Sequence, residues 1–172
     1  MKKLIIHAHP YEWSFNHALA HELQKTSHET RIINTATQPA EFYVPIEKKE
    51  LSENQKSVQW ADEIIFVFPI WWMDCPASMK NFIDTTFTRG FAFDYKDNKP
   101  LGLLSGKSCR IIATSWASLD PLFKFIFWLV WWKWRVEFCG MKYVWSLICW
   151  DVVQKTQEQR QQFMQKALSW IM

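Results

Sequence analysis

The first segment with side chains suited to chemistry follows the apolar run Lys3–Ala8. His9 supplies a ring nitrogen, and Ser14, Phe15 and Asn16 stand at the expected start of a helix. The free N–H groups and the dipole of a helix start favour an anion, so this segment could bind a phosphate group. Ser14 could equally serve only as the cap of that helix, which is the more common role of such a serine. The segment alone therefore leaves both interpretations open.

A second segment, Pro69-Ile70-Trp71-Trp72, follows the clearest buried strand candidate. Two neighbouring indoles could wall a planar ligand, because a tricyclic ring needs flat apolar side chains and nearby backbone donors. The chain holds 12 Trp and 13 Phe, so packing in the core is the alternative for both indoles.

Other kinds of site find little support in the sequence. None of the four glycines stands directly after the first apolar run, so the chain has no GxGxxG dinucleotide loop and no Walker loop. It has no GxSxG motif either. Four histidines could be drawn as a metal cluster. His7 and His9 would share one face of a strand. The helical pattern turns His17 and His21 to a polar helix side, so we expect surface histidines and no metal site.

The composition favours a cytoplasmic protein. A formal net charge of +3 over 172 residues, with no basic stripe, gives no reason to expect a nucleic-acid partner. The apolar run 125–132 is too short for a membrane span, which needs about 20 residues, and suits a buried helix or an oligomer contact. The cysteines form no CxxC pair and suit reduced, buried thiols: Cys75, Cys109, Cys139 and Cys149.

Strand and helix patterns alternate along the chain, which predicts one α/β domain over residues 1–172 with a parallel sheet covered on both faces. Ligands bind such a sheet at the carboxyl ends of its strands, where the first and third strands meet, and both segments fall there. The expected strands are Lys3–Ala8, Thr30–Asn34, Glu63–Phe68, Cys109–Thr114 and Lys142–Cys149. The expected helices begin after Ser14, at Ser52, at Pro76 with Gly90 as the C-cap, at Pro121 as far as about Trp134, and before Phe163, while 39–45 and 95–107 suit loops.

The two segments described above, together with three later ones at Pro76–Lys80, Phe87–Phe93 and Phe138–Gly140, resemble the NAD(P)H:quinone oxidoreductase family. The short bacterial members are the most similar in length, and they include the ancillary subunits of glutathione-gated potassium efflux systems. The similar motifs run in order from Lys3 to Met141: an HxxxxSFN opening at His9–Asn16, a PxxW…PAxxK segment at Pro69–Lys80, a vF…GfAf segment at Phe87–Phe93 and an fCG segment at Phe138–Gly140.

The resemblance implies a flavodoxin-like three-layer sandwich with a five-stranded parallel sheet in the order 2-1-3-4-5. It also implies a homodimer, a flavin reduced by NADH or NADPH, and transfer of two electrons to a quinone, nitroaromatic or azo compound. FMN is favoured over FAD because a short chain leaves little to cover an adenine. By position, the resemblance places His9, Ser14, Phe15 and Asn16 at the phosphate end of the flavin, Pro69, Ile70, Trp71 and Trp72 around its ring, and Thr114, Ser115 and Trp116 beside the ring.

The third of these loops departs from the family pattern. Family members usually carry Thr-Thr-Gly-Gly there, whereas this chain reads Thr114-Ser115-Trp116-Ala117. An indole in place of bare backbone could narrow or redirect the nicotinamide site. The Tyr and His that often follow the family glycines are also missing. The sequence therefore supports a second hypothesis, a flavin-binding regulatory module of a membrane transporter with little or no turnover.

Overall fold

The computed structural model describes residues 1–27, 29–40, 50–117 and 133–171. Its centre is a sheet of five parallel strands, as predicted. The strand order confirms the expected 2-1-3-4-5 arrangement: β2 (Thr30–Asn34), β1 (Lys3–His7), β3 (Glu63–Pro69), β6 (Ser108–Thr114) and β7 (Lys142–Cys149).

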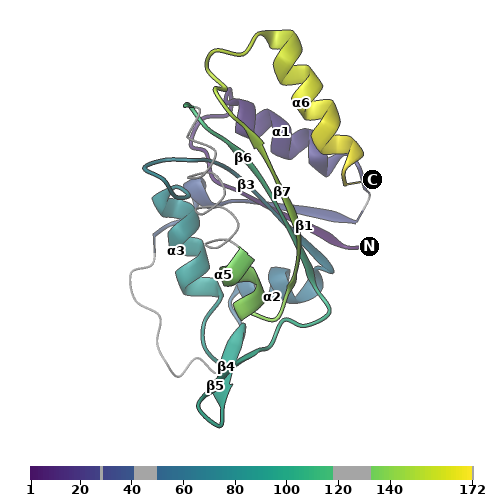
Figure 1. The fold of residues 1–172 in the computed structure, drawn as a ribbon. Coiled ribbons are helices and arrows are strands. Elements are labelled where there is room, and N and C mark those ends of the chain that lie inside the picture. Colours follow the sequence, from purple (N-terminus) through teal and green to yellow (C-terminus); the bar gives the residue numbers. More distant parts are fainter. Residues whose placement is uncertain (28, 41–49, 118–132, 172) are drawn as a thin grey trace.

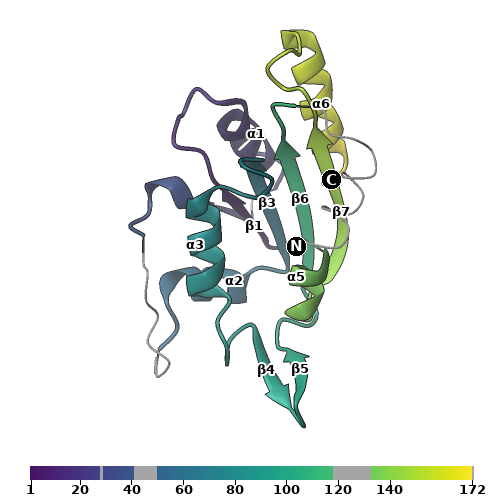
Figure 2. The same ribbon diagram turned by 60° about the vertical axis from the view of Figure 1, so that its left-hand side comes forward.

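Helices cover both faces of this sheet and complete three layers (Figures 1 and 2). One face carries α1 (Phe15–Gln24) and α6 (Gln157–Ser169). The other face carries α2 (Glu53–Trp60), α3 (Ala77–Thr86) and α5 (Lys133–Phe138).

The central strands are apolar because both of their faces are covered. Every residue of β1 and β3 is buried. Successive side chains alternate between the two helical layers, so that Leu4 and Ile6 pack on the α2–α3 side and Ile5 packs on the α1–α6 side.

Polar residues cap three of the described helices, α1, α2 and α6. Ser14 caps α1, as predicted, with its Oγ accepting from the His17 N–H at 3.1 Å. Ser52 and Thr156 form capping boxes at the starts of α2 and α6. A 3-10 turn, η1 (Thr35–Thr37), follows β2.

The structure corrects two local predictions. Part of the expected loop over 95–107 belongs to a hairpin of β4 (Phe93–Lys96) and β5 (Lys99–Gly102), because Asp97 and Asn98 adopt φ values of 53° and 59° and allow a two-residue turn. Gly90 does not cap α3, since the helix ends at Thr86.

Other predictions fall wholly or partly outside the described residues. These are the apolar run 125–132, most of the loop 39–45 and most of the helix predicted from Pro121, of which α5 begins at Lys133. Within the described ranges, no helix has the length and apolar character that crossing a bilayer requires.

Two side chains hold the carboxyl end of α6 against the sheet. The Lys3 ammonium, at the start of β1, donates to the Ile171 carbonyl at 2.7 Å. Arg110, near the start of β6, donates to the Trp170 carbonyl at 2.8 Å and pairs with the buried Glu63 carboxylate at 2.6 Å. These bonds fix α6 at the edge of the sheet where the strands begin.

Candidate functional site

A cavity of about 300 Å³ lies at the carboxyl ends of β1, β3 and β6. Small-molecule pockets run from about 300 to 1,000 Å³, so the cavity is of the right order for a compact ligand. It brings together nine of the eleven residues predicted from the sequence: His9, Ser14, Phe15, Asn16, Pro69, Ile70, Trp71, Thr114 and Trp116.

The start of α1 forms the polar side of this pocket. Ser14 Oγ accepts from the His17 N–H, which leaves the hydroxyl hydrogen free to donate to a ligand. The first N–H groups of a helix have no partner within the helix, so those of Phe15 and Asn16 also suit an anion. Ser14 therefore caps the helix and can contact a ligand as well.

His9 is placed to donate from the same side. Its Nδ1 accepts from the Tyr11 N–H at 3.2 Å, so a neutral ring carries its hydrogen on Nε2. Burial lowers the pKa of His9, which favours that neutral form. The His9 and Trp71 rings lie 5.9 Å apart between centroids, so the loops after β1 and β3 meet across the pocket.

Asn16 ties the helix start to β6. Its Nδ2 donates to Thr114 Oγ1 at 2.8 Å, and both residues are buried. Its Oδ1 is buried without a hydrogen-bond partner among the described residues. Because a buried oxygen without a partner is costly, this atom fits a bound hydroxyl or N–H group.

The two neighbouring indoles have different positions. Trp71 lines the pocket and is 45% exposed, whereas Trp72 is fully exposed and lies outside the pocket lining. The reason is a tight turn in which Trp71 and Asp74 exchange backbone hydrogen bonds of 2.9 and 3.1 Å. Trp72 and Met73 at its centre have positive φ values of 48° and 67°, which turn them away from the strand direction.

An ion pair anchors this turn to α5. The Arg135 guanidinium donates twice to the Asp74 carboxylate, at 3.1 and 3.0 Å, and both side chains are largely buried. The Asp74 carboxylate also accepts from the Cys75 N–H at 2.8 Å. Cys75 itself packs in the core, and burial, with the Asp74 charge, raises the pKa of its thiol to about 12.

The loop after β6 contributes Thr114 and Trp116 to the pocket, but not Ser115. Ser115 is buried, and its Oγ donates to the Ala117 carbonyl at 2.8 Å. The Trp116 indole is 74% exposed and borders the cavity. Trp116 therefore occupies the position at which the resembling family has a glycine, which carries no side chain.

Sequence reasoning missed four residues of the pocket lining: Trp13, Val152, Val153 and Arg160. Arg160 matters most for electrostatics, because it brings a permanent positive charge to the pocket from α6. Its Nε donates to the Val152 carbonyl at 3.2 Å, which orients the guanidinium. The polar segment that forms α6 gives no signal that this cation faces the first loop.

These residues fit FMN. A phosphate group matches the helix start, the Ser14 hydroxyl and the Arg160 charge. The ribityl hydroxyls match the unpaired Asn16 oxygen. A flat ring matches the apolar surfaces of Ile70, Trp71 and Trp116.

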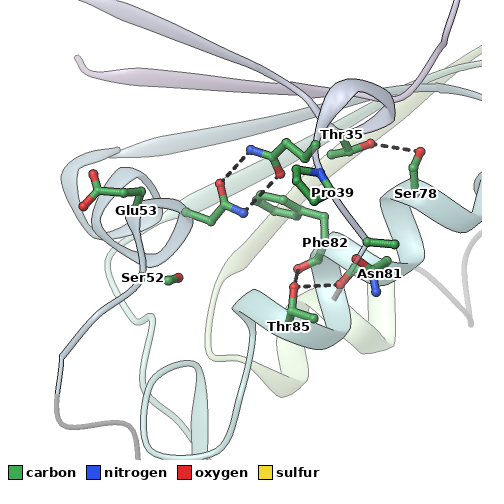
Figure 3. Close-up of a pocket in the computed structure, with 11 residues that line it drawn as sticks. Thr35, Pro39, Ser52, Glu53, Ser78, Asn81, Phe82 and Thr85 are labelled. Carbon is green, nitrogen blue, oxygen red and sulfur yellow. Dashed lines mark hydrogen bonds between the residues drawn. The ribbon is translucent and has the colours of Figure 1, made fainter. Parts of the chain in front are cut away.

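A second cavity of about 310 Å³ lies between η1, α2 and α3 and contains none of the predicted residues (Figure 3). Thr35 Oγ1 donates to Ser78 Oγ at 3.2 Å across it, and the amides of Gln38 and Asn54 form a reciprocal pair. Among the described residues that line it, Phe82 is the only aromatic one, so this part of the cavity is a poor match for a ring held between flat walls.

The histidines contradict the expectation of a surface location. His7 is 1% exposed, and His17 and His21 are half-buried against it. The prediction failed because the side of β1 on which α1 packs is not visible in the sequence.

Comparisons with known proteins agree with this fold. A family model described as a flavodoxin-like fold matches residues 1–171. The structure of Smu.1420 from Streptococcus mutans UA159 superposes with a TM-score of 0.80 at 26% identity, covering 99% of this chain and 98% of the other.

The names of the matched relatives describe oxidoreductases. A ribosyldihydronicotinamide dehydrogenase (quinone) of Pongo abelii is 27% identical over 180 residues, covering 82% of this chain and 78% of the relative. An FMN-dependent NADH:quinone oxidoreductase 2 of Listeria innocua is 38% identical over 52 residues, covering 30% of this chain and 25% of the relative. The human and mouse counterparts of the first are matched over 63% and 51% of their lengths, so the chain spans about half to four fifths of these curated relatives.

Proposed function

The chain belongs to the flavodoxin-like family, and on that premise we propose that it is a flavin-dependent NAD(P)H oxidoreductase that transfers two electrons to a quinone or a similar small aromatic acceptor. The observation that carries the proposal is one pocket with an anion-binding helix start on one side and indoles on the other. The names of both relatives support a quinone acceptor, and that of the Listeria innocua relative supports an NADH donor and FMN.

The described residues divide into groups with different tasks. Ser14, the α1 start and Arg160 would hold the phosphate, with His9 Nε2 available as a further donor. Asn16 and Thr114 would hold the ribityl chain, while Ile70 and Trp71 would flank the ring. Bound FMN supplies the ring that accepts a hydride and passes the electron pair on. The chain contributes position, a fixed charge and apolar walls that exclude water.

The direct test is reconstitution of the purified chain with FMN. We expect one FMN per chain, with flavin absorbance that bleaches under anaerobic conditions on addition of NADH or NADPH and returns on addition of a quinone. A chain that takes up neither FMN nor FAD contradicts the proposal. A chain that binds FMN but shows no turnover supports the regulatory module instead.

The two indoles provide a matched pair of variants. Trp71→Ala removes a pocket wall and is expected to weaken FMN binding by roughly 5–30-fold, the equivalent of about 1–2 kcal/mol of aromatic contact. Trp72→Ala removes a fully exposed side chain and should leave the affinity unchanged. Titration of flavin fluorescence measures both, and equal losses would contradict the assignment of Trp71 to the ring.

We also propose that this single flavin-binding domain acts as a homodimer in the cytoplasm. Large exposed aromatic side chains lie at or near the pocket, with Trp13 82% and Trp116 74% exposed, and such side chains suit an interface between copies. Four free, buried cysteines suit a reducing compartment. Light scattering should give twice the chain mass of 20.6 kDa, and a stable monomer at working concentration would contradict the dimer.

A further inference from the structure

Three histidines gather between β1 and α1, outside the flavin pocket. His7 is the last residue of β1, and His17 and His21 stand one helical turn apart on α1. The His17 and His21 rings lie 4.2 Å apart between centroids, and His7 lies 5.4 and 6.1 Å from them. One ring nitrogen of each histidine lies within 4.8 Å of the corresponding nitrogens of the other two.

The buried nitrogens of this cluster lack partners. Nδ1 of His7 and Nδ1 of His17 are both buried and make no hydrogen bond to any described residue. Polar atoms in that position are usually satisfied by protein, water or an ion. Burial, followed by the charges of the neighbouring histidines, lowers the pKa of His7 to about 4. Two buried ring nitrogens without a partner, in a cluster of three histidines, therefore point to a ligand that binds between the rings.

We propose that His7, His17 and His21 together bind one divalent transition-metal ion, with Zn²⁺ as the best fit. Three neutral imidazoles are a ligand set that zinc accepts, with a fourth position open to water. At Zn–N distances of about 2.0–2.1 Å, tetrahedral ligand nitrogens lie about 3.3 Å apart. The observed spacing reaches that value by small side-chain rotations, which the half-buried His17 and His21 permit.

The cluster shares no residue with the flavin pocket lining, so the metal site does not rest on the proposed oxidoreductase activity.

The test is Zn²⁺ binding by the full chain after removal of metal with a chelator. We expect one Zn²⁺ per chain by equilibrium dialysis and elemental analysis. At free Zn²⁺ about 100 times the dissociation constant, the Tm should rise by roughly 5–10 °C. Substitution by Co²⁺ should give a spectrum without the strong thiolate band, which separates histidine ligands from cysteine ligands. Absence of stoichiometric binding overturns the proposal.

Single substitutions locate the ion. His17→Gln and His21→Gln each remove one half-buried ligand and should weaken Zn²⁺ binding by at least roughly 100-fold, more than the loss of an outer-shell partner. His9→Gln is the matched control, because His9 lies outside the cluster, and it should bind Zn²⁺ as the parent chain does. If the two cluster variants bind Zn²⁺ as tightly as the control, the ion lies elsewhere and the assignment is wrong. Circular dichroism shows whether each variant is folded.

Discussion

At the scale of single residues, backbone geometry decides which side chains line the pocket proposed for the flavin. Trp71 and Trp72 are neighbours of the same type, yet only Trp71 lines the pocket, because Trp72 sits in a turn with positive φ. In the same way, Thr114 and Trp116 line the pocket on either side of Ser115, whose hydroxyl bonds within its own loop. Residue type alone does not distinguish Trp71 from Trp72, or the hydroxyl of Thr114 from that of Ser115.

The Trp116 indole is expected to affect the binding of the nicotinamide donor. It borders the pocket where the resembling family has glycine, so we expect it to restrict the space for a nicotinamide ring. The double substitution Trp116→Gly with Ala117→Gly should raise kcat/KM for NADH or NADPH by roughly tenfold, which corresponds to about 1.4 kcal/mol of relieved crowding. Stopped-flow reduction of the bound flavin measures it.

The control for this variant is Trp72→Gly. Trp72 is fully exposed, its φ of 48° suits glycine, and it does not line the pocket, so donor oxidation should remain unchanged. If the double variant reduces its flavin no faster than the parent chain, Trp116 does not obstruct the donor.

Much of the site was predictable from residues that stand directly after strands. Ser14 could be assigned as a cap from the pattern behind it, and His9 from its place after an apolar run. Arg160 was not predictable, because its helix is polar almost throughout and contact with the first loop depends on packing in three dimensions. The histidine cluster was missed for a related reason, since strand periodicity does not say which face a helix will cover.

At the scale of elements, the turn after β3 depends on α5. This turn holds Trp71 beside the pocket, and the Asp74–Arg135 pair connects the turn to α5 through a residue 61 positions further along the chain. Bidentate pairs between arginine and carboxylate fix geometry as well as adding energy. The described hydrogen bonds therefore make α5 a support for the side of the pocket that Trp71 forms.

Arg135→Met tests this support. We expect the free energy of unfolding to fall by about 1–3 kcal/mol, since a largely buried carboxylate loses charged hydrogen bonds. The affinity for FMN should fall as well, because the turn loosens. Denaturant titration and flavin fluorescence measure the two effects.

Arg89→Met provides the comparison. The Arg89–Asp94 pair has side chains that are 69% and 41% exposed, and exposed pairs contribute at most about 1 kcal/mol. This variant should therefore cost less stability and leave the affinity for FMN unchanged. Equal effects of the two substitutions would show that Arg135 acts only as a surface charge.

At the scale of the whole molecule, the parallel sheet hides every cysteine. The sheet order and the alternating elements could be predicted from the sequence, because the central strands β1 and β3 are apolar runs followed by polar or proline-containing loops. The hairpin of β4 and β5 could not, since its turn uses Asp97 and Asn98 and its strands are mostly exposed. The buried thiols follow from the sheet, with all four between 0% and 7% exposed.

These thiols should report global unfolding. Burial raises the pKa of Cys75 to about 12 and that of Cys139 to about 11, and it raises the pKa values of Cys109 and Cys149 as well. Since the thiolate is the reactive form, alkylation of the folded chain near pH 8 should be at least roughly 100-fold slower than in denaturant. Mass spectrometry counts the modified sites, and one fast cysteine in the folded protein would contradict this burial.

The helix α6 joins opposite edges of the molecule. Its carboxyl end is held by Lys3 and Arg110 where the strands begin, and Arg160 in its first turns reaches the pocket where they end. At 13 residues the helix is about 20 Å long and behaves as a rod. The position of the Arg160 charge at the pocket thus depends on hydrogen bonds at the opposite end of α6. Weakening those bonds should therefore change the pocket without altering any residue of its lining.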